Sequence, residues 1–166
     1  MTTEPTPSPD AARLERTYDA PANLIWELLT TADGLDEWWA PDGFETRVSE
    51  IELSPGGEVR YTMTAVAPKQ VAFMRSIGAP LSTAFQKTFT EVTSPTRLAY
   101  LTVIDFVPDR APYEHLTTID IEPAGDRTNV VMTLDPLHDE IWTRQHHAHR
   151  ADELDNLEKA VKRRAA

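Results

Sequence analysis

The chain has 166 residues, a mass of 18.6 kDa and a net charge of −11, which results from 16 basic and 27 acidic residues. This length predicts one domain with a self-sufficient core. So negative a chain repels phosphate backbones and anionic lipid, which makes nucleic acid and membrane surfaces poor candidates as partners. Cysteine is absent, which excludes disulfides, thiolate nucleophiles and thiolate metal ligands.

The N-terminal residues and the overall hydropathy predict where the chain resides. Residues 1–11 hold Pro5, Pro7 and Pro9 among polar residues, so we expect a disordered tail followed by a single domain over residues 12–166. No run of about 18 apolar residues could span a bilayer. The first residues also lack the charged-then-apolar pattern of a secretory signal. We therefore expect a cytoplasmic protein that does not bind membranes.

The first ordered segments predict a strand and two short helices. Leu14–Tyr18 is the strand candidate. Pro21 suits the first position of a helix, because its missing N–H needs no partner there. Apolar residues then recur at helical spacing, at positions 24, 25, 28 and 29. After an interruption, Leu35–Trp39 is predicted as a second short helix that ends at Pro41 and Gly43.

From Glu45 onward the hydropathy period changes from helical to two, which indicates strands. Val59, Tyr61 and Met63 alternate with polar residues, and the Pro-Gly-Gly sequence before them predicts a hairpin turn. The short turns between successive segments favour an antiparallel meander. The predicted strands are Arg47–Leu53, Glu58–Ala65, Val71–Ile77, Phe85–Val92, Arg97–Phe106, His115–Glu122 and Asn129–Leu134.

A long C-terminal helix is predicted from Asp139 to about Arg164. The segment has neither Gly nor Pro, and it ends in cations, which the helix dipole favours. At 1.5 Å per residue it would measure roughly 37 Å, enough to cross a whole sheet. Burying both layers requires the sheet to curve around the helix. The predicted class is α+β: a curved antiparallel sheet wrapped around a long C-terminal helix, with two short helices after the first strand.

Five local strings, spread over nearly all of the chain after the tail, carry a family resemblance. They are Asp19-Ala20-Pro21 with Trp26, Trp38-Trp39-Ala40-Pro41-Asp42-Gly43-Phe44, Leu53-Ser54-Pro55-Gly56-Gly57-Glu58-Val59, Phe89-Thr90-Glu91-Val92 with Pro95-Thr96-Arg97-Leu98, and Leu154-Asp155-Asn156-Leu157. With this order of elements, the chain resembles the helix-grip superfamily of birch-pollen-allergen-like, START-like and polyketide-cyclase-like proteins (SRPBCC). Within that superfamily it is similar to the activator of heat-shock protein 90 ATPase homologue-like family.

The resemblance implies a helix-grip fold with a hollow between the curved sheet and the C-terminal helix. It implies no particular reaction, because the superfamily includes lipid carriers, cyclases, dioxygenase subunits and co-chaperone domains. The chain departs from many relatives about five residues before Leu154, where they carry a small residue, often glycine, and this chain has His149. We therefore expect a hollow that is smaller or more polar than usual.

The residues expected to line this hollow are mostly apolar or aromatic with a few polar groups, which is the composition of a small-molecule site. Trp38 and Trp39 are expected at its rim, packing the short helix against the sheet. Tyr61, Met63, Tyr100 and Trp142 have a second interpretation, since rings at alternate strand positions commonly form plain core. The expected lining residues are Tyr61, Met63, Phe73, Arg75, Phe85, Tyr100, Ile119, Trp142, Gln145 and His149.

Two cations have alternative interpretations. Arg75 shares its predicted strand with apolar residues, and Lys87 lies between two phenylalanines. If these strand faces point inward, the two cations favour a carboxylate or phenolate ligand, because a buried charge needs a partner. Otherwise their long side chains reach the rim or pair with Glu91 or Asp105.

Four of the five histidines lie between positions 138 and 149. Among them His146 and His149 have same-face spacing, and such a pair can chelate a metal with help from Asp139 or Asp152. The His-Glu-x-x-His arrangement is absent, however. We expect solvated histidines with His149 facing the hollow, no metal site and no cofactor. A partly buried His149 could titrate near neutral pH and donate to a ligand oxygen.

We expect the chain to bind a small apolar or amphipathic molecule, such as a lipid, in this hollow. No catalytic residue is assigned, and a binding protein is favoured over an enzyme, because Gly-x-Ser-x-Gly and glycine-rich phosphate motifs are absent. Two alternatives stay open. One is stimulation of a chaperone ATPase, a stress-response role that the family name implies. The other is a small cyclase- or hydratase-type enzyme with His149 or Tyr100 as proton donor.

The sequence fits either a monomer or a homodimer. Residues 98–106 are apolar on both faces of their predicted strand. A strand buried on both sides needs a second cover besides the helix. A second copy of the chain could supply that cover.

Overall fold

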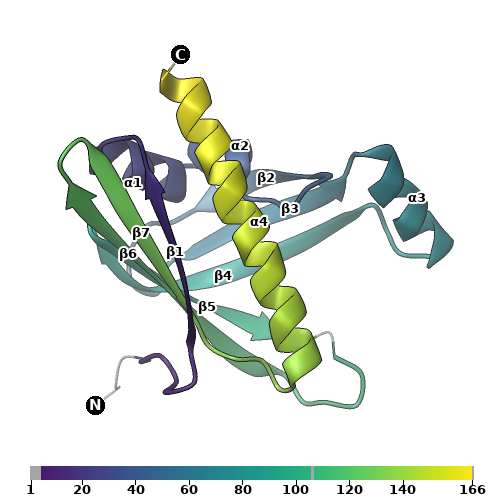
Figure 1. Ribbon diagram of the computed structural model, residues 1–166. Helices are drawn as coiled ribbons and strands as arrows, with labels where there is room; N and C mark the ends of the chain where they lie inside the picture. The colour runs from purple at the N-terminus through teal and green to yellow at the C-terminus, as the bar shows by residue number, and fades with distance from the viewer. Residues whose placement is uncertain (1–4, 106, 166) are drawn as a thin grey trace.

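The computed structural model describes residues 5–105 and 107–165. Within them, seven strands form one antiparallel sheet in the order β1-β7-β6-β5-β4-β3-β2, and the long helix α4 (Glu140–Ala165) crosses one face of it (Figure 1). The α+β prediction, with two short helices after the first strand, is confirmed. The remaining elements are β1 (Ala12–Tyr18), α1 (Ala22–Thr30), α2 (Ala32–Trp38), β2 (Phe44–Ile51), β3 (Glu58–Ala65), α3 (Pro68–Ser76), β4 (Ser82–Thr93), β5 (Arg97–Ile104), β6 (Tyr113–Ala124) and β7 (Arg127–Leu134).

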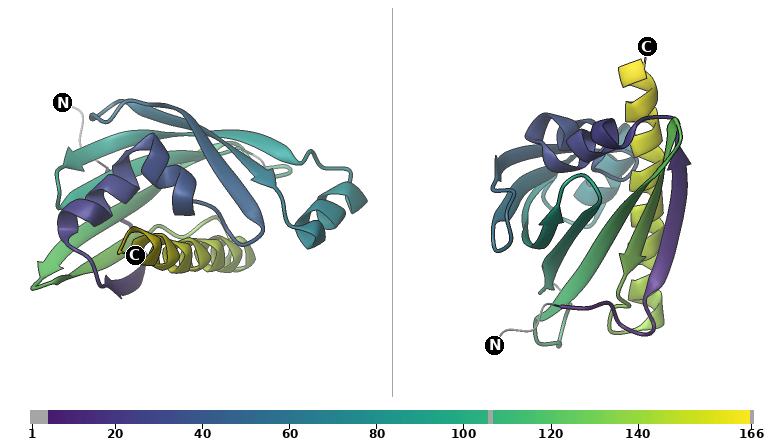
Figure 2. Two further views of the ribbon diagram at one scale, coloured as in Figure 1. Left: turned by 90° about the horizontal axis from the view of Figure 1, so that it is seen from above. Right: turned by 90° about the vertical axis from the view of Figure 1, so that its left-hand side faces the viewer.

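The sheet curves around α4, and irregular pairings contribute to the bend. Strands β2 to β7 are neighbours in chain order, whereas β1 pairs with β7, so β1 and β2 form the two edges. The pairing register shifts between Val48 and Glu50 in β2 and between Phe89 and Glu91 in β4. Such bulges increase the twist of a strand and bend it. Helix α4 consequently lies along the inner side of a curved sheet (Figure 2).

One predicted strand is wrong. Residues 71–77 belong to α3 and its C-terminal end, and α3 stands away from α4 beyond the ends of β3 and β4 (Figure 1). The apolar residues of this segment alternate as they would in a strand. However, Pro68 suits the first turn of a helix, and Gly78, at φ +71°, supplies the left-handed residue that commonly ends one. The helix leaves Phe73 and Ile77 61% and 59% exposed.

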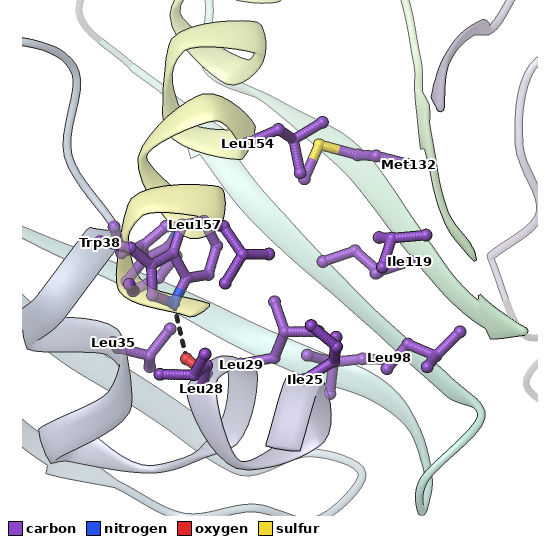
Figure 3. Packing of buried hydrophobic residues seen from close by; sticks show 14 of the residues in the cluster. Ile25, Leu28, Leu29, Leu35, Trp38, Leu98, Ile119, Met132, Leu154 and Leu157 are labelled. Atoms are coloured by element: carbon purple, nitrogen blue, oxygen red, sulfur yellow. Dashed lines mark hydrogen bonds between the residues drawn. The ribbon is translucent and has the colours of Figure 1, made fainter. Parts of the chain in front are cut away.

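The apolar core lies between the sheet and the C-terminal half of α4. Leu154 and Leu157 of α4 are fully buried and lie among side chains of α1, α2 and the sheet (Figure 3). The indole Nε1 of Trp38 donates to the carbonyl oxygen of Leu28 at 2.7 Å, which holds α2 against α1. Complete burial of a leucine side chain, as at Leu154 and Leu157, contributes roughly 1.5–3 kcal/mol to the stability of the folded state. The other labelled residues of Figure 3 are Ile25, Leu29, Leu35, Leu98, Ile119 and Met132.

The two halves of α4 differ in their attachment to the rest of the molecule. The buried residues of the described helix all belong to its second half: Glu153, Leu154, Leu157, Ala160 and Val161. That half also binds the α2 region, because Asn156 Nδ2 donates to the Ala40 carbonyl oxygen at 2.7 Å and Arg164 pairs with Glu37 at 2.6 Å. In the first half, by contrast, Ile141 is 66% exposed. The core therefore anchors α4 mainly through its C-terminal half.

Tyr18→Phe tests the attachment of β1 to α4. The Tyr18 hydroxyl donates to the carbonyl oxygen of Leu154 at 2.8 Å, and burial raises the pKa of the phenol, so it stays a neutral donor. Without this donor, we expect the free energy of unfolding in urea to fall by about 1 kcal/mol. Thr17→Val is the control, because it removes a hydrogen bond that is exposed, from the Thr17 hydroxyl to Asn129 Oδ1 at 3.2 Å. An equal effect of both substitutions would contradict the assigned hydrogen bond.

Some expectations about the ends and faces of the molecule stay predictions. Of the tail expected at residues 1–11, residues 1–4 lie outside the described residues, as does Phe106 at the end of the predicted strand Arg97–Phe106. Within the described part of the tail, the Ser8 amide donates to Asp135 Oδ1 at 2.8 Å. On the outer face of β5, Ala99 is buried and Val103 is exposed; the homodimer stays a prediction. In residues 5–105 and 107–165, no helix is long and apolar enough to cross a membrane.

Candidate functional site

A buried lysine lies on the inner face of the sheet. Lys87 of β4 is opposite Val59 of β3, and its neighbour on the same strand face, Phe85, is opposite Tyr61. The Lys87 side chain is only 6% exposed. Its amine nitrogen Nζ lies 5.7, 6.0 and 5.3 Å from the ring centroids of Trp39, Tyr61 and Tyr100. Aromatic faces at such distances attract a cation, so the three rings form a cage around the amine.

The Lys87 amine has little polar compensation for its burial. It donates to the Thr102 hydroxyl oxygen at 2.8 Å. Among the described residues, no carboxylate forms a salt bridge with it. The pKa of Lys87 is lowered to about 7, chiefly by burial and also by the nearby Arg150 cation, whereas the Glu153 carboxylate acts in the opposite direction. The amine therefore gains or loses its proton near neutral pH, far below the ordinary range of a lysine.

Helix α4 places an ion pair against the same interior. Arg150 Nη2 donates to Glu153 Oε2 at 2.6 Å, and the Glu153 side chain is almost completely buried. Burial alone would lower the pKa of Arg150, but Glu153 raises it, so the guanidinium stays charged. Arg150 Nη1 also lies 3.3 Å from His146 Nε2. Because a guanidinium can only donate, His146 Nε2 accepts and its proton is on Nδ1.

A second histidine contacts His146 from β6. The rings of His115 and His146 have centroids 4.6 Å apart. His115 Nε2 lies 2.6 Å from the Asp135 carbonyl oxygen; a carbonyl only accepts, so Nε2 carries the proton and Nδ1 is an acceptor. Burial lowers the pKa of both histidines, and the Arg150 and Lys87 cations lower them further. Both rings are therefore neutral at pH 7.

We call Lys87, His115, His146, Arg150 and Glu153 the polar cluster. Four buried atoms of this cluster meet no hydrogen-bond partner within the described residues: His115 Nδ1, His146 Nδ1, Arg150 Nε and Glu153 Oε1. Buried polar atoms are normally paired, so each such exception requires an explanation. The cluster contains one carboxylate, that of Glu153, and two basic side chains, those of Lys87 and Arg150. It is a polar, electropositive region inside a chain of net charge −11.

Solvent reaches the edge of this region beside Phe85. The Phe85 ring stacks on Tyr61 with centroids 5.5 Å apart, yet it is 38% exposed. Because Phe85 shares the inner face with Lys87, its exposure marks where α4 no longer covers the sheet. Strands β3 and β4 run on past α4 in this direction (Figure 1). The Tyr61 ring contacts both groups: its centroid lies 5.5 Å from that of Phe85 and 6.0 Å from Lys87 Nζ.

The apolar part of the interior is closely packed. A void of about 10 Å³ lies among Leu35, Trp38, Phe89, Leu98 and Ile119 and their neighbours. A volume of that size holds at most one water molecule. The apolar core therefore has no room for an organic guest.

The structure brings together only part of the predicted lining. Gln145 and His149 lie on the exposed side of α4, and Phe73 and Arg75 lie exposed on α3. Trp142 is partly buried near the start of α4, where its ring centroid is 5.5 Å from that of His138. The predicted residues that share the inner face of the sheet are Tyr61, Met63, Phe85, Tyr100 and Ile119.

The inward-facing histidine of α4 is His146, where the sequence predicted His149. Helical phase explains the difference. His146, Arg150, Glu153 and Leu157 are spaced by four, three and four residues, so they form one stripe toward the interior. His149 precedes Arg150 by one residue, which turns it by about 100° around the helix axis and out of that stripe, and it is exposed.

Trp38 and Trp39, predicted at the rim, are both nearly buried. They also line a surface groove of about 490 Å³ between the α2–β2 connection and the second half of α4. The groove carries charges of both signs, including Glu37, Lys159 and Arg163. This mixture selects no particular ligand charge.

The described histidines and carboxylates are not arranged as a metal site. Across residues 5–105 and 107–165, no three such side chains lie together in a way that could hold an ion. The pair considered in the sequence, His146 and His149, diverges because one ring points inward and the other outward.

The fold and the comparisons together identify the class of the protein. A curved antiparallel sheet holding a long C-terminal helix defines a helix-grip α+β protein. Residues 19–162 match the family described as Activator of Hsp90 ATPase homolog 1-like protein. The chain belongs to this family, which confirms the resemblance seen in the sequence. No match was found among curated proteins.

Solved structures support the fold. A Nitrosomonas europaea protein is 21% identical with a TM-score of 0.70, over 93% of this chain and 96% of its own. An Arthrobacter aurescens protein is 16% identical with a TM-score of 0.72, over 97% and 93%. The AHSA1 protein of Silicibacter pomeroyi is 15% identical with a TM-score of 0.70, over 92% and 97%. At such identities the likeness concerns the fold, and contact with a chaperone ATPase stays a prediction.

Proposed function

We propose that the chain binds a small amphipathic molecule with an acidic group in the interior between the sheet and α4, at Lys87. The observation that carries this proposal is the Lys87 amine enclosed by Trp39, Tyr61 and Tyr100. A buried cation is costly unless an anion or several hydrogen bonds compensate it. A carboxylate or phenolate of a guest would provide that compensation, and its apolar part would meet the aromatic rings.

The surroundings of Lys87 support this choice of ligand. The carboxylate of Glu153 bonds Arg150, so it is already engaged. The unpaired nitrogen atoms of His115 and His146 offer one acceptor and one donor to a guest. Phe85, stacked on Tyr61 and partly exposed, provides an apolar entrance. These features together favour an amphipathic acid over a purely apolar molecule.

Matched acids and alcohols test the proposal by isothermal titration. We expect decanoate or naphthoate to bind at least about tenfold more tightly than decanol or naphthalenemethanol, because hydrogen bonds to charged groups contribute about 1.5–3 kcal/mol. The preference should decline as the pH rises above about 7, since Lys87 then loses its charge. Lys87→Met should abolish the preference, whereas Lys69→Met on exposed α3 should retain it. Equal affinity of wild type for acid and alcohol would contradict the proposal.

A further inference from the structure

We propose that Lys87 also captures aldehydes or ketones covalently, forming an imine between its Nζ and the carbonyl carbon of a guest with an apolar or aromatic body. This inference deepens the proposed function and rests on its interior site. The geometry that suggests it is an amine held in an aromatic cage, with one hydroxyl partner and no bonded carboxylate among the described residues.

The first requirement of such chemistry is an unprotonated amine. An ammonium group has no lone pair, and an ordinary exposed lysine at pKa about 10.4 is neutral in only about one molecule in 2,500 at pH 7. Burial and the Arg150 cation bring the pKa of Lys87 to about 7. Desolvation beside a second cation is a known means of activating a lysine as a nucleophile. About half of Lys87 therefore carries a free lone pair at neutral pH.

The second requirement is an amine that is not already committed to a carboxylate. Glu153, the buried carboxylate of the polar cluster, is held by Arg150 at 2.6 Å. The Thr102 hydroxyl accepts from Lys87 Nζ at 2.8 Å, which restricts the position of the nitrogen but leaves its lone pair free. A neutral hydrogen bond of this kind is weaker than a salt bridge and does not enforce protonation.

The reaction balances without any further reagent. The Nζ lone pair forms a bond to the carbonyl carbon, and the carbonyl oxygen takes up a proton to become a hydroxyl. The first of the two amine protons ends on this hydroxyl, and the second protonates it, so that it departs as water while the C=N bond forms. The products are one imine and one water molecule. The rings of Trp39, Tyr61 and Tyr100 surround the nitrogen and limit access of water to the imine, which would otherwise hydrolyse it.

Reductive trapping tests this inference. The full chain would be incubated with propanal or benzaldehyde and cyanoborohydride at pH 7, and the labelled positions mapped by peptide mass spectrometry. The chain has four lysines, so exposed Lys69, Lys159 and Lys162 serve as internal controls. We expect the labelling rate at Lys87 to exceed that of each control by at least about tenfold at pH 7, with the advantage shrinking at pH 10.

The outcomes separate this inference from the proposed function. Lys87→Met should remove the dominant label while leaving the labels on the three exposed lysines, and saturating decanoate should protect Lys87. If neither aldehyde labels Lys87 faster than the exposed lysines, covalent capture is overturned. Tighter binding of acid than alcohol would in that case still support the non-covalent site. Rapid labelling of Lys87 without any preference for acids would instead contradict the proposed function and retain the imine.

Discussion

Lys87→Met is expected to raise the free energy of unfolding at pH 7 by about 2–3 kcal/mol. The pKa of Lys87 falls from 10.5 to about 7 on folding, chiefly through burial. Each pKa unit corresponds to about 1.4 kcal/mol, so burial of this amine costs the folded state about 4 kcal/mol at pH 7. The variant also loses the contacts of the amine with the three aromatic rings and with the Thr102 hydroxyl, so the net gain in stability is smaller than about 4 kcal/mol. Urea denaturation of both proteins measures it.

The stability difference between wild type and Lys87→Met should depend on pH, because the folded and unfolded chains bind the lysine proton over different pH ranges. The unfolded chain binds the lysine proton below about pH 10.5, whereas the folded chain binds it only below about pH 7. Stability of the wild type therefore falls as the pH decreases from 10.5 to 7 and is unaffected by this group at lower pH. The difference between wild type and Lys87→Met should shrink to below about 1 kcal/mol at pH 10. A difference that does not change with pH would contradict the lowered pKa.

Glu153→Gln is expected to lower the free energy of unfolding by about 3–5 kcal/mol. The substitution keeps the size of the side chain but removes the anion from the polar cluster. Arg150 is then buried without its partner, beside the Lys87 cation. Removing one member of a buried ion pair is more damaging than removing both, because the remaining charge is uncompensated. Chemical denaturation at pH 7 measures the effect.

Two further variants separate this explanation from a general effect on α4. Glu158→Gln removes an exposed carboxylate paired with Lys162 at 3.4 Å and should change stability by less than about 0.5 kcal/mol. The double substitution Arg150→Met with Glu153→Leu should recover most of the loss, because both members of the ion pair are then removed together. If the double variant is as unstable as Glu153→Gln, the ion pair is not the cause.

Much of the fold follows from hydropathy periods in the sequence. Each of these elements buries one face, and that burial produces a regular hydropathy period. Examples are the alternation within Glu58–Ala65 and the helical spacing of Leu154, Leu157 and Val161. The prediction of a strand at residues 71–77 was wrong because the helix found there, α3, buries no residue. A helix without a buried face has no reason to show a period of 3.6, and the alternation of its apolar residues was accidental. Only Pro68 and Gly78 marked its ends.

The interior site was predictable on the sheet side and not on the helix side. Strand alternation alone places Tyr61, Phe85 and Lys87 on one face, and the sequence left open whether Lys87 points inward. The charged stripe of α4 was missed because Arg150 and Glu153 have the three-residue spacing of an ordinary surface pair. Their positions seven and four residues before the apolar Leu157 could have indicated that both side chains lie on the buried side of the helix.

The unequal attachment of α4 has a mechanical consequence. Its second half is fastened by Leu154, Leu157 and the contacts of Asn156 and Arg164 with the α2 region. Its first half contributes none of the buried residues of the described helix and meets the sheet through polar side chains such as His146, so moving it outward exposes little apolar surface. Because segments with few buried apolar contacts open locally more easily than a packed core, we expect the first half of α4 to detach at a free energy below that of global unfolding.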